Sequence, residues 1–337
     1  MNFSVTIQPT GQVMQVNEGE TLLDAALRQS IGLPYGCRSG LCGSCLCSLE
    51  SGQVDYPDGP SETLRDKPTN ALLSCQAVPR SDLLIQVPEL LQAQDFEVKT
   101  LPCKVHSLER IAHDVVRLQL KLPEGDRLQF QAGQYLNVIL ADGRKRAFSL
   151  ANAPHDDAFI ELHVRHVEGG QFTDYVFAQM QPKALLRIEA PLGGFTLRES
   201  SERPMIFVAG GTGFAPIKGI IEHIIHIGDP RPLQLYWGAH AERDLYLRPL
   251  AEQWQQEHSQ MRFIPVLSEP DPDWAGRSGW VHQAVLADNP DLSGFDVYMA
   301  GPPPMIQAAK QGFEAAGLDL ARLYSDSFEY GAAADKT

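Results

Sequence analysis

The chain has 337 residues, which is too long for one ordinary hydrophobic core and predicts two or three domains. Its formal net charge of −14 argues against a nucleic-acid partner, because no basic stripe is present to neutralise phosphates. No window approaches the roughly 18 apolar residues of a membrane span. Phe3, Val5 and Ile7 alternate with polar residues, which is typical of a strand and unlike a secretory signal. We therefore expect a cytoplasmic protein, whose acidic surface either steers a basic protein partner or only maintains solubility.

The first predicted domain, residues 1–92, opens with a hairpin pattern and a short helix at 21–30. A loop rich in cysteine and small residues follows, with the spacing C-x4-C-x2-C and one more cysteine after a long interval. This is the spacing of plant-type 2Fe-2S ferredoxins, in which four thiolates hold two irons. The predicted iron ligands are Cys37, Cys42, Cys45 and Cys75.

The alternative for this loop is a zinc site. Zinc usually takes paired C-x2-C knuckles, and only one such pair is present, so the iron–sulfur cluster is favoured. The remaining cysteines, Cys47 and Cys103, are expected to be small buried hydrophobic residues. The stretch 33–45, LPYGCRSGLCGSC, resembles the ferredoxin domain of bacterial oxygenase and sugar-dehydrase reductases. The resemblance implies a β-grasp fold for this domain.

A linker-like stretch at 92–95 leads to the second predicted domain, residues 96–200. Short alternating runs at 115–120, 135–140 and 159–164 are separated by turn signals. Many short strands with such turns predict a small antiparallel β-barrel.

The tetrapeptide RAFS at 146–149 ends one of the strand-like regions. Arg146 can hold a flavin pyrophosphate by charge-assisted hydrogen bonds, Phe148 offers an aromatic surface, and the Ser149 hydroxyl can reach the flavin edge, which makes it a candidate catalytic residue. Taken alone, the tetrapeptide fits an exposed strand end with a solvated arginine equally well.

The same tetrapeptide resembles the Arg-x-Tyr-Ser motif of the ferredoxin–NADP reductase superfamily, with Phe148 in place of tyrosine. The aromatic surface is kept and a phenol hydrogen bond is lost. Further matches are HVR at 163–165, GGQFT at 169–173 and PLGGF at 191–195; the second leads into a helix start, which favours phosphate. The resemblance implies bound FAD. The implied flavin residues are Arg146, Phe148, Ser149, His163, Arg165, Gly170, Gln171 and Thr173.

The third predicted domain, residues 203–337, changes its pattern to alternating strands and helices. Strands are predicted at 205–209 and 233–237, with a helix at 215–227 between them. This alternation predicts a doubly wound parallel sheet. The other predicted elements are a helix at 242–256, strands at 262–267 and 296–300, and a helix at 305–316.

The turn GGTG at 210–213 follows a strand and opens a helix. Its glycines permit close approach of a pyrophosphate, although helix–sheet packing explains them as well. The turn resembles that of the same superfamily, and MAGPPPM at 299–305 resembles its Cys-Gly-Pro-Pro-x-Met element. Ala300 replaces the cysteine, so no thiol role beside the nicotinamide is expected. The implied NAD(P)H residues are Gly211, Thr212, Gly213, Gly301 and Pro302. Phe328 is the second candidate catalytic residue: the resemblance places it near the flavin, although simple core packing explains it as well.

The domain order resembles that of CDP-6-deoxy-Δ3,4-glucoseen reductases and of the reductase components of multicomponent oxygenases. It implies that electrons pass from NAD(P)H to FAD, to the 2Fe-2S cluster and then to a separate electron-accepting protein, an oxygenase component or a sugar dehydrase. A hydride carries two electrons and the cluster accepts one at a time. A flavin can accept both electrons and release them singly. A free-flavin reductase is one alternative, which the cluster motif opposes, and a non-enzymatic redox sensor is another, which the intact motifs oppose.

The coenzyme choice depends on residues that follow the strand at 233–237. His240 and Arg243 suit the 2′-phosphate of NADPH, whereas Glu242 suits the free ribose hydroxyl of NADH. NADH is weakly preferred.

Overall fold

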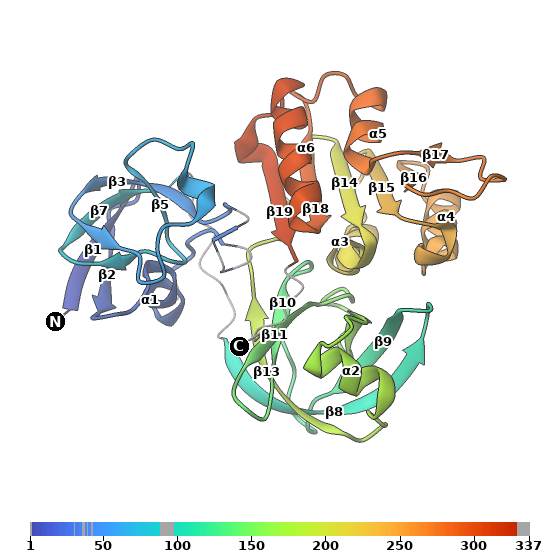
Figure 1. Ribbon diagram of the computed structural model, residues 1–337, viewed down its shortest axis with the longest axis horizontal. Helices are drawn as coiled ribbons and strands as arrows, with labels where there is room; N and C mark the ends of the chain where they lie inside the picture. Colours follow the sequence, from blue (N-terminus) through green and yellow to red (C-terminus); the bar gives the residue numbers. More distant parts are fainter. Residues whose placement is uncertain are drawn as a thin grey trace. The chain divides into compact units, whose positions relative to one another are not determined.

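The computed structural model describes residues 2–29, 31–35, 38, 40–41, 43–87 and 98–328. The chain divides into two compact units, Met1–Val98 and Lys99–Thr337 (Figure 1). Two predicted iron ligands, Cys37 and Cys42, lie outside the described residues, as does the predicted linker at 92–95. In the part of the chain that is described, no helix is long and apolar enough to cross a membrane.

The first unit is built on a five-stranded mixed sheet with the order β2-β1-β7-β3-β5. Val5 and Ile7 of β1 are fully buried, as their alternation predicts, and β1 pairs in parallel with β7. Helix α1 begins after Thr21, whose hydroxyl accepts a hydrogen bond from the amide of Asp24. This is the β-grasp arrangement that the resemblance implies. The elements are β1 (Asn2–Gln8), β2 (Gln12–Asn17), α1 (Leu22–Arg28), β3 (Leu46–Ser51), β4 (Val54–Asp55), η1 (Glu62–Leu64), β5 (Ala71–Leu73), β6 (Val78–Pro79) and β7 (Leu83–Gln86).

The second unit begins with a six-stranded antiparallel sheet in the order β11-β10-β13-β8-β9-β12, which we call the barrel. Its inward side chains form one apolar core, to which Leu118, Leu136 and Leu162 contribute without any exposed surface. The predicted antiparallel barrel is confirmed. Its elements are β8 (Lys99–Arg110), β9 (Val115–Lys121), β10 (Tyr135–Ile139), β11 (Lys145–Ser149), β12 (Ile160–Arg165), α2 (Gln171–Ala178) and β13 (Leu185–Leu192).

The same unit ends with a six-stranded parallel sheet in the order β17-β16-β15-β14-β18-β19. The order reverses between β14 and β18, which is where doubly wound sheets bind their ligands. The elements are β14 (Met205–Gly210), η2 (Gly211–Gly213), α3 (Phe214–Ile227), β15 (Leu233–Ala239), η3 (Glu242–Asp244), α4 (Arg248–Glu257), β16 (Met261–Leu267), β17 (Arg277–Ser278), α5 (Val281–Asp288), β18 (Asp296–Gly301), α6 (Pro303–Ala315), η4 (Leu320–Arg322) and β19 (Leu323–Ser327).

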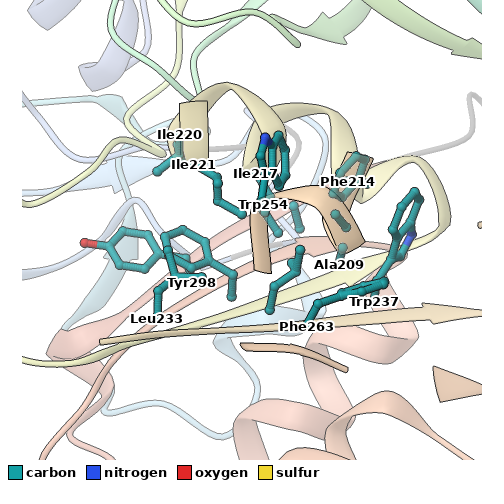
Figure 2. Close-up of a cluster of buried hydrophobic side chains, with 14 of the residues drawn as sticks. Ala209, Phe214, Ile217, Ile220, Ile221, Leu233, Trp237, Trp254, Phe263 and Tyr298 are labelled. Carbon is teal, nitrogen blue, oxygen red and sulfur yellow. The ribbon is translucent and has the colours of Figure 1, made fainter. Parts of the chain in front are cut away.

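Both faces of the parallel sheet are covered by helices. Alternate residues of β14 enter two separate apolar clusters: Phe207 packs with α3 and α4, whereas Val208 packs with α5 and α6. Figure 2 shows the first cluster, in which Trp237 and Trp254 lie with the isoleucines of α3. A strand that is buried on both faces consists of a continuous run of apolar residues, and for this reason β14 could be predicted from the sequence.

Four elements differ from the sequence-based expectation. The helix predicted from residue 242 is split into η3 and α4, because Leu245–Leu247 leave the helical path and Pro249 occupies the first turn of α4. Helix α5 and strand β19 were not predicted. The predicted last helix begins earlier, at Pro303, since prolines are tolerated in a first turn.

Candidate functional site

Cys45 and Cys75 lie side by side in the first unit. Cys45 directly precedes β3 and Cys75 closely follows β5, and the pairing of Leu46 with Leu73 brings the two together. Their Sγ atoms are 3.2 Å apart, and both residues are buried and form no disulfide. The amide of Ser74 donates to the carbonyl of Cys45, which fixes the loop. Two buried sulfurs at this separation can bind one metal ion.

The surroundings of these sulfurs fit an iron–sulfur cluster. The Ser74 hydroxyl, next to Cys75, is fully buried and has no hydrogen-bond partner within the described residues. Buried polar groups are normally paired, and cluster sulfurs accept hydrogen bonds. Burial, together with the nearby Cys75, raises the pKa of Cys47 to about 12, and burial raises the pKa of Cys103 to about 12. Both stay protonated, as small apolar residues should.

Three predicted flavin residues lie on β11. Arg146 is half-buried, and its Nη1 donates to the carbonyl of Lys145. The half-buried Phe148 ring meets Phe172 at a centroid distance of 5.3 Å. Ser149 is buried, and its hydroxyl faces a carboxylate oxygen of Asp326 at 3.4 Å. A cation, a partly open aromatic surface and a buried hydroxyl on one short strand fit a flavin.

Helix α2 begins beside β11, where Phe172 meets Phe148, and no side chain caps its first turn. The hydroxyl of Thr173 is bonded to both backbone groups of Val167, so it shapes the loop that precedes the helix. Gln171 accepts a hydrogen bond from Arg144. The first amides of the helix therefore remain available to an anionic group, as a phosphate requires.

The barrel meets the predicted coenzyme turn at Arg165. Its Nε donates to Asp114 at 2.8 Å, and its Nη1 would lie 3.3 Å from a Cβ atom on Gly211. Gly211 has a φ of +53°, which favours glycine. One cation of the barrel thus lies directly against the turn that follows β14.

The two predicted glycine elements of the parallel sheet pack against each other. A Cβ atom on Gly213 would lie 1.9 Å from the carbonyl oxygen of Ala300, and one on Gly301 would lie 3.1 Å from the Cα of Gly210. Gly213 is therefore required by helix–sheet packing, the alternative that the sequence left open. Around Gly211, in contrast, the nearest obstacle is the flexible end of an arginine. Pro302 is the residue that precedes α6.

Strand β19 and the residue after it connect the flavin strand β11 with the end of β18. The amide of Phe328 donates to the carbonyl of Gly301 at 3.0 Å, and its ring packs against the apolar cluster of Figure 2. Two residues earlier, Asp326 accepts the bond from Ser149. The structure therefore brings Ser149, Gly301 and Phe328, predicted from three separate motifs, to one place.

Comparisons with known proteins agree with this geometry. The chain matches family models for a 2Fe-2S iron-sulfur cluster binding domain at residues 5–80, an oxidoreductase FAD-binding domain at 102–197 and an oxidoreductase NAD-binding domain at 207–311. It is 40% identical over 328 residues to the CDP-6-deoxy-L-threo-D-glycero-4-hexulose-3-dehydrase reductase of Yersinia pestis, covering 97% of this chain and 99% of the relative. The chain belongs to the iron–sulfur flavoprotein reductases.

Two further relatives support the assignment. The reductase is 35% identical to the reductase component 1 of terephthalate 1,2-dioxygenase from Comamonas, over 97% of this chain and 98% of the relative. The crystal structure of the Amycolatopsis cytochrome P450 reductase GcoB is similar with a TM-score of 0.81 and 32% identity, covering 97% of this chain and 98% of that one. The predicted family, fold class, cofactors and electron-transfer function are confirmed: the reductase is an NAD(P)H-dependent oxidoreductase with FAD and a 2Fe-2S cluster.

One predicted flavin residue has a different environment from the others. His163 is fully buried, and both of its ring nitrogens are engaged, Nε2 by Glu161 and Nδ1 by the hydroxyl of Tyr246, each at 3.0 Å. These partners were not predicted from the sequence, and neither was the buried Lys218, which lies 3.2 Å from Glu161. A lysine within an apolar run of helix α3 was the one visible signal, since lysine is almost never fully buried unless it is paired.

Proposed function

We propose that the reductase oxidises NADH at the place where Ser149, Gly301 and Phe328 meet, and that single electrons leave through the cluster to a separate protein. The observation that carries this proposal is that Asp326 of β19 is bonded to Ser149 of β11, while Phe328, directly after β19, is bonded to Gly301 at the end of β18. When bound, FAD supplies acceptance of a hydride and release of single electrons. Hydride transfer needs no acid or base, so the side chains of the site have to bind the cofactors, orient them and exclude water.

We assign the binding residues as follows. Arg146, Phe148 and the start of α2, with Gly170, Gln171 and Thr173, hold FAD, and Arg165 lies between FAD and the coenzyme. Two observations support this assignment: the side chain of Arg146 is half-buried, and no side chain caps the first turn of α2. The proposed coenzyme residues are Gly211, Thr212, Gly213, Gly301 and Pro302, the proposed cluster ligands are Cys37, Cys42, Cys45 and Cys75, and the proposed domains are 1–92, 96–200 and 203–337.

The choice of NADH rests on the charges that follow β15. Glu242 pairs with Arg248, which also pairs with Glu252, so this arginine is already neutralised. His240 is bonded to Ser268 and has a glutamate nearby. Arg243 is exposed and has a carboxylate oxygen of Asp244 at 3.9 Å, so each of the three cations in this region has an acidic neighbour that would oppose a 2′-phosphate. The expected result is a kcat/KM at least about ten-fold higher for NADH than for NADPH.

The electron acceptor is proposed to be an oxygenase component or a sugar dehydrase. The Yersinia relative is named for a hexulose dehydrase and the Comamonas relative for a dioxygenase, and the chain resembles both over nearly its whole length. A cytoplasmic location is proposed with it, because none of the cysteines in the described part of the chain forms a disulfide.

A cysteine variant of the full chain tests the electron path. Cys75→Ser should still reduce ferricyanide with NADH and should lose most reduction of cytochrome c, because that protein takes single electrons from the cluster. Superoxide dismutase is present to remove the indirect route. Cys47→Ser, a buried thiol beside the same loop, is the matched control and should reduce both acceptors. Equal cytochrome c reduction by the unaltered protein, Cys75→Ser and Cys47→Ser would contradict electron transfer through the cluster and favour a free-flavin reductase.

A further inference from the structure

A row of polar side chains crosses the joint between the barrel and the parallel sheet. Lys218 of α3 lies 3.2 Å from Glu161 of β12, Glu161 lies 3.0 Å from Nε2 of His163, and Nδ1 of His163 lies 3.0 Å from the hydroxyl of Tyr246. Three of the four side chains are about nine-tenths buried or more. The row therefore starts and ends in the parallel-sheet part and passes through one strand of the barrel.

The protons in this row have one arrangement. Burial alone would raise the pKa of Glu161, but the hydrogen bond from His163 and the charge of Lys218 lower it to about 2, so the carboxylate only accepts. Burial lowers the pKa of His163, which is therefore neutral. Its Nε2 must carry the proton that Glu161 accepts, which leaves Nδ1 to accept from the hydroxyl of Tyr246. Lys218 also donates to Glu222 and to the carbonyl of Ala151.

The far end of the row reaches the coenzyme turn. The ring of Tyr246 meets Trp237 edge-on at a centroid distance of 5.1 Å and an interplanar angle of 86°. Trp237 stacks on Phe214 with the ring centroids 3.8 Å apart, and its Nε1 donates to the carbonyl of Gly211 at 3.0 Å. Both rings are labelled in Figure 2. A continuous set of contacts thus connects strand β12 with the turn that follows β14.

We propose that His163 and Tyr246 are positioning residues, which hold the Gly211 turn at a fixed place relative to the barrel and thereby set the approach of the nicotinamide to the flavin. The proposal rests on the proposed function. It gives His163 a role other than contact with the cofactor, because neither ring nitrogen is available to a ligand. Rates of group transfer depend steeply on such placement, and a misplacement of about 1 Å can cost about a hundred-fold.

Tyr246→Phe in the full-length holoprotein tests the proposal, since it removes one hydroxyl and keeps the ring against Trp237. Tyr175→Phe, at an exposed tyrosine of α2, is the matched control. Rapid mixing with NADH gives the limiting rate of flavin reduction and the concentration for half-maximal rate. Hydrogen–deuterium exchange of residues 207–217 reports the turn without any turnover, and FAD content reports the barrel.

We expect Tyr246→Phe to lower the limiting rate at least about five-fold, to speed exchange in the turn and to keep its FAD, whereas the control changes none of these. An unchanged rate and unchanged exchange would overturn the proposal. So would loss of FAD in parallel with the rate, because the hydroxyl would then act through general stability. Failure of the unaltered protein to oxidise NADH would refute the proposed function alone, since the exchange measurement still tests whether the row holds the turn.

Discussion

Replacing Gly213 with alanine tests the packing between the coenzyme turn and β18. The new Cβ atom would lie 1.9 Å from the carbonyl oxygen of Ala300, whereas ordinary contacts begin at 3.4 Å, so one backbone must move by about 1.5 Å. Ala300 belongs to a fully buried strand, which cannot rotate away as a side chain does. Overpacking of a core typically costs 1–3 kcal/mol. We expect a loss at the upper end, about 3 kcal/mol in the free energy of unfolding.

Gly211→Ala is the matched control, two residues earlier in the same turn. Gly213 has φ −57° and ψ −14°, which alanine adopts freely, so its cost is steric alone. Gly211 has φ +53°, and a Cβ there meets only the mobile end of Arg165. Its cost is that of a left-handed residue, about 1–2 kcal/mol.

Tryptophan fluorescence in a urea titration measures both variants. The four tryptophans all lie between positions 237 and 280, so the signal reports the parallel-sheet part and no other. A smaller loss for Gly213→Ala than for Gly211→Ala would refute the steric argument. A shift of the midpoint with an unchanged slope is required for the comparison to be one of stability.

Three further predictions concern the cofactors and the buried charges. Cys75→Ser should lose the cluster and Cys47→Ser should keep it, as measured by iron content and the rhombic spectrum after one-electron reduction; equal iron in both would contradict the ligand assignment. Arg146→Ala should weaken FAD binding by roughly 1.5–3 kcal/mol, the value of a hydrogen bond to a charged group, and an unchanged affinity by flavin fluorescence would exclude Arg146 as a phosphate donor. Glu161 has a folded pKa of about 2 against 4.5 for the free side chain, so its stabilising effect is complete above pH 4.5 and is lost as the pH falls toward 2. Glu161→Gln should flatten acid unfolding over this range, and an unaltered acid transition would rule out the ion pair as its cause.

Local patterns of the sequence were sufficient for most of the fold. Three features could be predicted because each depends only on residues that are neighbours in the sequence. They are the cysteine spacing around Cys45, the alternating apolar residues of β1 and β9, and the continuous apolar run of β14. Helix α5 was missed because Val281–Asp288 is short and only its residues toward β15 and α6 are buried. Strand β19 was missed because Asp326 and its serine neighbours look like a loop, although they are buried in the sheet.

The site was predictable only where a motif carried it. The glycine turn, the Gly-Pro-Pro element and β11 were found, but their convergence through Asp326 depends on a contact 177 positions away from Ser149. Likewise, the partner of His163 lies 83 positions further along the chain. No local pattern encodes such a pairing, because it forms only when two complete substructures meet.

The row from Lys218 to Tyr246 also has a consequence for synthesis of the protein on the ribosome. The barrel strand that carries His163 leaves the ribosome 83 positions ahead of Tyr246. At about 5–20 residues per second, the imidazole of His163 meets this partner about 4–17 s after its own synthesis. During this interval the polar side chains of Glu161 and His163 on strand β12 lack the partners that they have in the folded protein. The strands and apolar core of the barrel are complete once β13 has emerged, whereas the polar side chains on β12 gain their last partners only when helix α3 and the loop before α4 have emerged.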